Sequence, residues 1–359
     1  MKKNTAIICL SPHYGGMELD AIRYAQLLSD SLNIILIAKK GSSIEEGYTA
    51  RATNNTIKLI SIPFRSNFSF SIIFGVRKII KEHKIQNVIF FGASELKSLY
   101  FSFLNLDINL IIRHGTTKSH PKKDWLHQLV YSQVNWHIPI CKHIANNVKY
   151  IIPFGKSTLM KVIYPSLPEK FFEYNNSSRK NDEILTLLIV SRITEGKGHI
   201  DAIQACATLD HNGISFNLVC VGDIDPNFSE KLNNTLNNIS YRSNIKYPGF
   251  SDNVVEYYNR ADIFIFPSRG EGLSNSFIEA LGSGLQCVSY NNTSFPELKD
   301  VGFKFQMAKD GNIEDLVAKL NQSVMDLKTN DTDLNDNITL AKELFCNKRE
   351  RTEILALLV

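Results

Sequence analysis

The stretch ADIFIFPSRGEGLSNSFIEALGSGLQCVS, residues 261–289, decides how the second half of this chain folds. It begins with an apolar run that predicts a buried strand, continues through a Gly/Ser/Asn turn, and ends in an amphipathic helix followed by another apolar run. A strand, a turn of small residues and a helix N-terminus favour anion binding, because unpaired backbone N–H groups and the helix dipole both attract phosphate. Glu271 and Glu279 lie eight positions apart around this turn. Their carboxylates are candidates to accept hydrogen bonds from hydroxyl groups.

The surroundings of Glu279 decide between two interpretations of this segment. A glutamate on a helix is most often a solvated surface residue. Here Phe277, Ile278, Ala280 and Leu281 surround it, and a carboxylate among apolar side chains must be paired or used for binding. A phosphate site flanked by hydroxyl acceptors indicates a nucleotide-sugar site.

Residues 267–284, PSRGEGLSNSFIEALGSG, resemble the E-x7-E signature of retaining GT-B glycosyltransferases, specifically glycosyltransferase family 4 (glycosyl transferases group 1). The resemblance implies that Glu271 contacts hydroxyls of the donor sugar and that Glu279 contacts the ribose. It also implies retaining, metal-independent transfer, in which the acceptor attacks from the side that the diphosphate leaves. The turn residues between the glutamates are expected to line the donor site: Leu273, Ser274 and Asn275.

A second loop supplies candidate phosphate ligands. In VSRITEGKGH, residues 190–199, Arg192 and Lys197 follow an apolar run and resemble the S-R-x4-K-G loop of the same family. Two cations in a loop more often mean surface charge, but the resemblance implies that this pair holds the diphosphate and stabilises the leaving group.

The segments VGDIDP and KYPGFSDN are expected to border the nucleotide. Gly222 is predicted to be a glycine that allows close approach, and Phe250 and Ser251 are predicted base contacts. The sequence 223–225, Asp-Ile-Asp, also has the form of a DxD metal motif. Its position resembles the glycine-rich loop of GT-B proteins instead, so we expect no metal and no cofactor other than the donor, which is expected to be UDP- or GDP-linked.

The first half carries weaker signals. Gly15 and Gly16 separate an apolar run from a helical pattern, and the family has a loop here whose amides point at donor phosphate or acceptor. His114 ends another apolar run, at the carboxyl end of an expected strand. The resemblance implies that it approaches the donor sugar, whereas a polar histidine at a strand end more often makes a structural hydrogen bond. The basic residues around and after it are candidate acceptor ligands: Arg113, Lys118, Lys122 and Lys123.

Alternating apolar and helical runs predict repeated βα units and hence doubly wound parallel sheets. The chain has 359 residues, which suits two domains. We expect an acceptor-binding domain at 1–165 and a donor-binding domain at 166–339, separated near the polar stretch 166–183, with a helix at about 340–359 as a candidate to pack back on the first. The resemblance implies the GT-B architecture, two Rossmann-like domains facing a central cleft. Strands are expected near 5–10, 33–38, 57–62, 87–91, 109–113, 137–140, 162–164, 185–190, 215–221, 244–247, 263–266, 286–289 and 302–305.

Charge is divided unevenly along the chain. Residues 1–165 hold 21 Lys+Arg against 9 Asp+Glu, a formal +12, and the remainder holds 19 against 27, a formal −8. The basic half therefore indicates an anionic partner. An anionic glycan or glycolipid acceptor, with lipopolysaccharide or another surface polysaccharide as the first expectation, and an anionic membrane surface are the candidates. Nucleic acid is not expected, because no RNA-binding signature is present.

Further patterns narrow the class. No apolar run reaches the roughly 18 residues of a spanning helix, and six scattered cysteines show no metal-ligand spacing, so we expect a cytoplasmic protein, with the cytoplasmic face of the inner membrane as the alternative place. The sequence contains no GxGxxG, which counts against a nicotinamide dehydrogenase. Two functions besides glycosyl transfer stay open, a nucleotide-sugar 2-epimerase and a non-catalytic binding subunit.

Overall fold

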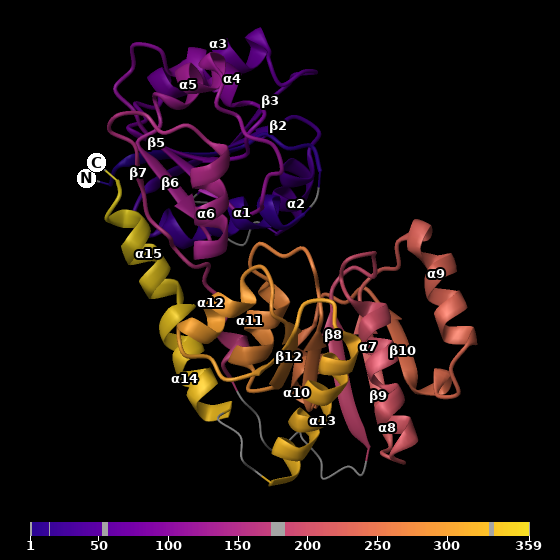
Figure 1. Ribbon diagram of the computed structural model, residues 1–359. Helices are drawn as coiled ribbons and strands as arrows, with labels where there is room; N and C mark the ends of the chain where they lie inside the picture. The colour runs from indigo at the N-terminus through magenta and orange to yellow at the C-terminus, as the bar shows by residue number, and fades with distance from the viewer. Residues whose placement is uncertain (1, 14, 52–56, 174–183, 330–333, 359) are drawn as a thin grey trace. The chain divides into compact units, whose positions relative to one another are not determined.

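The computed structural model describes residues 2–13, 15–51, 57–173, 184–329 and 334–358, which form two compact domains (Figure 1). The first comprises Met1–Pro165 and Asn347–Val359, and the second comprises Ser166–Cys346. Of the polar stretch 166–183, residues 166–173 belong to the second domain and 174–183 lie outside the described residues.

The first domain contains a parallel sheet in the order β3-β2-β1-β4-β5-β6-β7. Its central strands are almost wholly buried, because each is a nearly continuous apolar run covered on both faces. The strands are β1 (Asn4–Cys9), β2 (Asn33–Lys39), β3 (Lys58–Ile62), β4 (Asn87–Phe91), β5 (Asn109–His114), β6 (Trp136–Pro139) and β7 (Leu159–Met160).

Helices cover both faces of this sheet (Figure 1). One group contacts β1 and β2 or one another: α1 (Gly16–Ser29), α2 (Ser43–Arg51) and α15 (Asn347–Leu355). The other group contains α3 (Phe70–Glu82), α4 (Leu96–Phe103) and α5 (Trp125–Tyr131), while α6 (Lys142–Ile151) packs against β6. Of the predicted C-terminal helix, only the part from Asn347 onward belongs to the first domain.

The second domain contains a parallel sheet in the order β10-β9-β8-β11-β12-β13. The strands are β8 (Leu185–Val190), β9 (Phe216–Val221), β10 (Ile245–Gly249), β11 (Ile263–Phe266), β12 (Gln286–Tyr290) and β13 (Gln306–Ala308). In both sheets the strand order reverses beside the first strand of the domain, between β1 and β4 and between β8 and β11. The carboxyl ends of strands at such a reversal are where open α/β sheets bind ligands.

The helices of the second domain again form two groups. Those that contact β11, β12, β13 or one another on one face are α7 (His199–Ala205), α8 (Ala207–His211) and α13 (Ile313–Thr329). The second group contains α10 (Val255–Arg260), which contacts β8, α11 (Asn275–Gly282), which contacts β11 and β12, and α14 (Leu334–Leu344), which packs on α11. The remaining segments are the helices α9 (Pro226–Asn237) and α12 (Phe295–Asp300) and the short 3-10 turns η1 (Glu169–Phe171) and η3 (Arg242–Asn244).

Two predicted strands are displaced. At 162–164 the chain is irregular, and the strand is β7 three residues earlier, although Ile163 N still donates to Pro139 O on β6. At 302–305 there is no strand, since Phe303 and Phe305 are buried as core side chains and β13 begins only at Gln306. Burial without pairing explains the error at 302–305, whereas at 162–164 the chain keeps a hydrogen bond to β6 without forming a regular strand. Two doubly wound parallel-sheet domains, as predicted, are present.

Among the residues that the structure describes, no helix combines the length and the apolar character needed to cross a bilayer.

Candidate functional site

The loops that follow β8 and β11 meet at the strand-order reversal of the second domain. The Arg269 amide donates to Gly196 O at 2.9 Å, which ties the β11 loop to the β8 loop. The contact is close at Gly198, whose φ is 81° and where a Cβ would lie 2.3 Å from Pro267 O. Only glycine fits here, so the spacing of Lys197 from the β11 loop depends on Gly198.

Lys197 and Glu271 meet where these loops join. Lys197 Nζ lies 2.6 Å from Glu271 Oε1, and Ser268 Oγ lies 3.0 Å from the same oxygen. None of the described residues bonds the other carboxylate oxygen of Glu271. An ammonium has three N–H donors, so Lys197 can hold Glu271 and an incoming anion together. The predicted residues are thus brought together with bonding capacity left over.

The turn before α11 presents a helix N-terminus to the same sheet edge. Ser274 is the N-cap, and its Oγ accepts from Phe277 N at 3.3 Å. Leu273 and Ser274 are buried while Asn275 is exposed. The free amides of this first turn, with the helix dipole, favour an anion at this position.

Glu279 is held by a tyrosine from a separate helix. Tyr258 Oη, on α10, lies 3.0 Å from Glu279 Oε2 and 3.1 Å from Ser276 O. Burial raises the pKa of Glu279 to about 7, and the hydrogen bond from Tyr258 works in the opposite direction. The carboxylate therefore changes its charge close to neutral pH.

The remaining predicted donor residues lie on neighbouring loops. Arg192 is exposed after β8, and no described residue forms an ion pair with it. Gly222 has φ 142°, and a Cβ there would lie 2.1 Å from Ser191 O, so its close approach is to the Arg192 loop itself. Phe250 is exposed after β10, and Ser251 Oγ accepts from Asn253 N at 3.2 Å. Their contacts with a nucleotide stay predictions.

The aspartates of the DxD-like sequence make hydrogen bonds that hold the local structure. Asp225 is the N-cap of α9, and its Oδ1 accepts from Asn227 N at 2.9 Å. The Asp223 carbonyl accepts from Ile193 N at 2.8 Å, which joins this loop to the β8 loop.

In the first domain, Gly15 and Gly16 lie at the corresponding reversal, after β1. Gly15 is the N-cap of α1 and offers no side-chain cap. A Cβ at Gly16 would meet nothing within 4 Å, so the backbone is open to approach there. The helix is 14 residues long and presents its amides at this end.

His114 is buried at the end of β5 and pairs with a second histidine. His114 Nε2 lies 2.9 Å from His137 Nδ1 on β6. Burial holds the pKa of His114 well below its usual range and lowers that of His137 to about 3, so both rings are neutral. His114 thus makes a structural hydrogen bond, which is one of the two roles expected from the sequence. An approach of His114 to a donor sugar stays a prediction.

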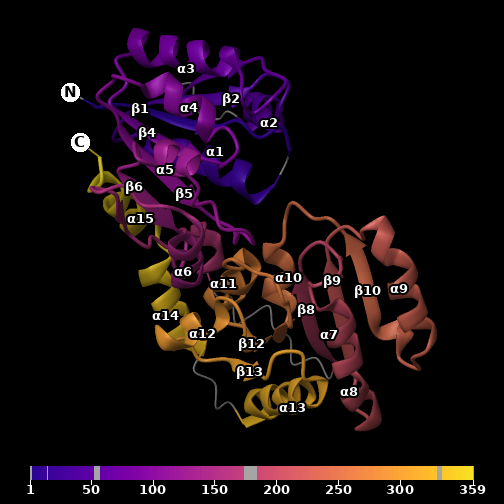
Figure 2. The same cartoon turned by 45° about the horizontal axis from the view of Figure 1, so that its top comes forward.

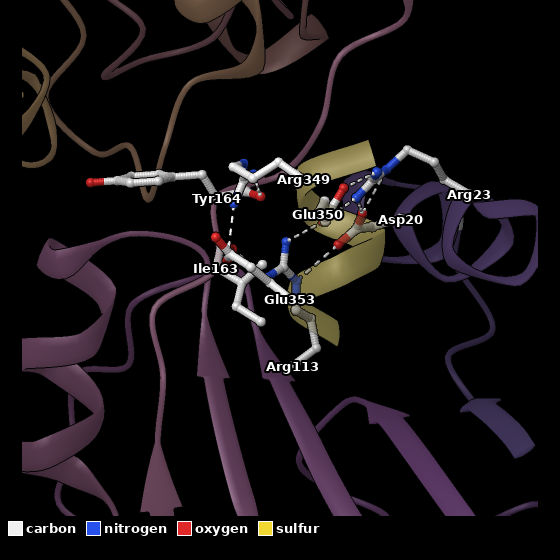
Figure 3. Close-up of polar contacts among 8 residues, drawn as sticks. All are labelled: Asp20, Arg23, Arg113, Ile163, Tyr164, Arg349, Glu350 and Glu353. Atoms are coloured by element: carbon white, nitrogen blue, oxygen red, sulfur yellow. Dashed lines mark hydrogen bonds and ion pairs between the residues drawn. The ribbon is translucent and has the colours of Figure 1, made fainter. Parts of the chain in front are cut away.

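Arg113 does not fulfil its predicted role as an acceptor ligand. Its side chain is 1% exposed, and its guanidinium lies 3.4 Å from Asp20 Oδ2 and 3.4 Å from Glu350 Oε1 (Figure 3). It also donates to Ile163 O at 2.7 Å, and Glu350 binds Arg23 at 2.5 Å. Each guanidinium nitrogen contacts a protein oxygen in a buried network that anchors α15, and this burial corrects the prediction.

The basic loop after His114 is fixed by its backbone. Asn147 on α6 exchanges two 2.9 Å hydrogen bonds with the backbone of Lys118, and Lys122 N donates to Ile151 O. Burial lowers the pKa of Lys118 to about 8. Lys123 is exposed, with Nζ 5.9 Å from the ring centre of Tyr150. The three lysines remain candidate acceptor ligands.

Sequence reasoning missed two residues that hold the glutamates. Ser268 was visible inside the signature as the residue after the proline, although its bond to Glu271 could not be read from it. Tyr258 lies on a helix that carries no motif, and only the fold brings it to Glu279.

Residues 170–338 match the family described as glycosyl transferases group 1. This range covers almost the whole second domain and includes both glutamates, Arg192 and Lys197. The match confirms the predicted resemblance to glycosyl transferases group 1, and the narrower assignment to family 4 stays a prediction.

Relatives with curated descriptions share this class. The amylovoran biosynthesis glycosyltransferase AmsK of Erwinia amylovora is 31% identical over 144 residues, which is 38% of this chain and 35% of that protein. The matched part thus spans about a third of the length of that relative. The capsular polysaccharide biosynthesis glycosyltransferase CapH of Staphylococcus aureus is 22% identical over 82% of this chain and 84% of its own.

A solved structure shares the fold over both domains. The Anabaena protein HepE, in complex with UDP, superposes with a TM-score of 0.82, covers 99% of this chain and 98% of its own, and is 15% identical. At this identity the likeness shows the fold alone.

Proposed function

We propose that this protein is a glycosyltransferase that moves a sugar from a nucleotide diphosphate donor to an anionic glycan or glycolipid. The observation that carries the proposal is the Lys197–Glu271 contact with Ser268, at the strand-order reversal of a domain that belongs to glycosyl transferases group 1. The contact leaves donors on the lysine and one oxygen on the carboxylate for a substrate.

Each donor group then has a binding partner of suitable chemistry. Arg192 and Lys197, with the first-turn amides of α11, bind the diphosphate. The unbonded oxygen of Glu271 accepts from a sugar hydroxyl, and Glu279 accepts from the ribose. Gly222, Phe250 and Ser251 border the base. Gly15, Gly16 and His114 remain candidate ligands of the first domain by itself. UDP is the first donor nucleotide to test, because the structure of the Anabaena protein, which has the same fold, contains UDP.

The proposed chemistry is retaining and metal-independent. The bond from the anomeric carbon to the diphosphate oxygen breaks, and the acceptor oxygen bonds to that carbon on the same face. The acceptor's proton goes to the departing diphosphate. Arg192 and Lys197 stabilise the negative charge that develops on the leaving group, the usual source of the largest catalytic effect.

The acceptor is proposed to belong to surface polysaccharide or lipopolysaccharide synthesis. Two of the relatives act in amylovoran and capsular polysaccharide synthesis, which supports this class. The cationic excess of the first domain supports a negatively charged acceptor, with Lys118, Lys122 and Lys123 as its ligands. The alternative partner of the basic first domain is an anionic membrane surface on the cytoplasmic side.

The test is calorimetry with UDP-, GDP- and ADP-sugars, each with and without EDTA. We expect one nucleotide sugar to bind in EDTA, and Glu279→Ala and Arg192→Gln to weaken it at least ten-fold. If no nucleotide sugar binds and Glu279→Ala changes nothing, the proposal is wrong. Turnover of the donor to an epimer without any acceptor would identify a 2-epimerase instead, and binding without any turnover would identify a non-catalytic subunit.

A further inference from the structure

An aromatic patch lies on the first domain, outside every residue assigned above. It consists of Phe68, Phe70, Phe74 and Phe101, of which the first three are 54%, 71% and 66% exposed. These residues lie on and just before α3 and on α4, which are side by side in both views (Figures 1 and 2). Isolated surface phenylalanines are common, whereas a contiguous group of them marks an interaction site.

The rings contact one another in two pairs, on the adjacent helices α3 and α4 and the segment just before α3. Phe70 and Phe74 stack with ring centres 6.2 Å apart, and Phe68 meets Phe101 edge-on at 6.0 Å. Core packing does not require these side chains, because the inward face of α3 is supplied by other residues. The buried ones are Ile72, Ile73, Val76, Ile79 and Ile80.

Cations lie at the margin of this patch. Lys40 and Arg65 line an open pocket of about 540 Å³ together with three serines that flank the start of α3. Along the exposed stripe of α3, Phe70 and Phe74 are followed at the same four-residue spacing by Lys78. The segment 63–81 contains four Lys+Arg and no Asp or Glu. An apolar surface with a basic rim is complementary to an apolar layer under negative headgroups.

The arrangement of charge favours one occupant over the alternatives. A second copy of this chain seated on the same patch would bring Arg65 and Lys78 against their own counterparts, so like charges would oppose the contact. Single-stranded nucleic acid needs aromatic faces that are open between cations, yet Phe70 and Phe74 stack on each other and the cations lie at the rim.

We propose that the aromatic patch docks on an anionic phospholipid bilayer, with the phenylalanines entering the interfacial layer and Lys40, Arg65 and Lys78 meeting lipid phosphates. Docking of this kind depends on both terms, the buried apolar area and the attraction to anionic lipid. It does not depend on the donor site of the second domain.

The test is co-sedimentation of the full chain with vesicles of phosphatidylcholine, alone or mixed with phosphatidylglycerol. We expect binding to the mixed vesicles and at least ten-fold weaker partitioning of the Phe70→Ser/Phe74→Ser variant. Arg65→Gln/Lys78→Gln should weaken binding and reduce its salt dependence. Leu159→Ser is the matched control, because Leu159 is 53% exposed on β7 of the same domain, and it should partition like the wild type.

Other outcomes overturn the proposal. They are unchanged partitioning of the double phenylalanine variant, no preference for anionic vesicles, binding of a single-stranded oligonucleotide in place of vesicles, or a wild-type dimer that this variant converts to a monomer. Folding of each variant is checked by tryptophan emission, since both tryptophans, Trp125 and Trp136, lie in the first domain. Nucleotide-sugar binding should be unchanged in every variant, which separates this proposal from the proposed function.

Discussion

The two domains place charged side chains at equivalent edges of similar sheets and use them differently. At the end of β5, Arg113 is buried, and its guanidinium contacts oxygens of Asp20, Glu350 and Ile163. At the ends of β8 and β11, Lys197 and Glu271 are partly exposed and keep unused bonding capacity. A cation at a strand end therefore does not identify a binding site by itself, and the exposure of its side chain together with its unused N–H donors is the better criterion.

The largest expected effect is on the buried network. Glu350→Ala leaves Arg23 and Arg113 without their shared carboxylate, which is 0% exposed. Removing one partner of a buried ion pair costs about 3–5 kcal/mol, and the carboxylate that remains, Asp20, can neutralise only one of the two arginines. We expect the denaturant midpoint of the first domain to fall, as measured by tryptophan emission. An exposed i,i+4 pair of the same domain gives the control: Glu82→Ala, which breaks the contact with Lys78, should change the midpoint little. Equal effects would contradict the distinction drawn between the two edges.

The second effect is on catalysis. Glu271→Gln keeps the shape of the side chain and removes the charge that faces Lys197 and the donor sugar. We expect sugar transfer to fall about 100-fold, the scale of losing one electrostatic contact made in the transition state. Initial rates measure it, and unfolding should change little. Lys231→Met is the control, since its pair with Glu195 is exposed, and it should leave the rate unchanged. A full rate in Glu271→Gln would remove Glu271 from the site.

The third effect compares two glycines of one loop. Gly196 and Gly198 have φ of 83° and 81°, but only a Cβ at Gly198 collides, 2.3 Å from Pro267 O. Gly196→Ala should cost about 1 kcal/mol for the left-handed backbone. Gly198→Ala should cost about 3 kcal/mol, since overpacking adds to the same strain. Thermal unfolding of the second domain gives both values, and nucleotide-sugar affinity should fall only for Gly198→Ala. If both variants behave alike, the loop contact does not set the position of Lys197.

The smallest effect is a pH dependence. Burial raises the pKa of Glu279 to about 7, and the ionised form is the hydrogen-bond acceptor. Affinity for the nucleotide sugar that the calorimetric screen identifies should therefore rise from pH 6 to pH 8 by up to about ten-fold, following the ionised fraction. The hydrogen bond from Tyr258 favours the charged form, so Tyr258→Phe should move the midpoint to higher pH. Calorimetry checks both, with Glu279→Gln as the control that should bind independently of pH. An unshifted midpoint in Tyr258→Phe would show that Tyr258 does not act on Glu279.

The sequence was informative where a residue's structural neighbours are also close to it in the sequence. The strand, turn and helix that contain Glu271 and Glu279 were predictable, because the apolar periodicity, the small-residue turn and the cap lie within one segment. The two-domain parallel-sheet class followed from the alternation of such segments.

Contacts across distant segments were not predictable. The environment of Arg113, on β5, depends on Glu350, which comes 237 residues later and lies on α15. His114 likewise meets His137 only because β5 and β6 pair in the sheet. The strand predicted near 302 shows the same limit, since Phe303 and Phe305 are buried without pairing in the sheet.

The C-terminal helix has a consequence for the order in which the protein is made. The core of the first domain includes Ile354, Leu357 and Leu358, and Asn109 Nδ2 donates to Leu357 O at 2.8 Å. These residues leave the ribosome only after the whole second domain has been translated. At about 5–20 residues per second, the nascent first sheet waits on the order of 10–40 seconds for the helix that covers it. During that interval its apolar face is open to chaperones and to wrong partners, while the second domain already has all of its own strands.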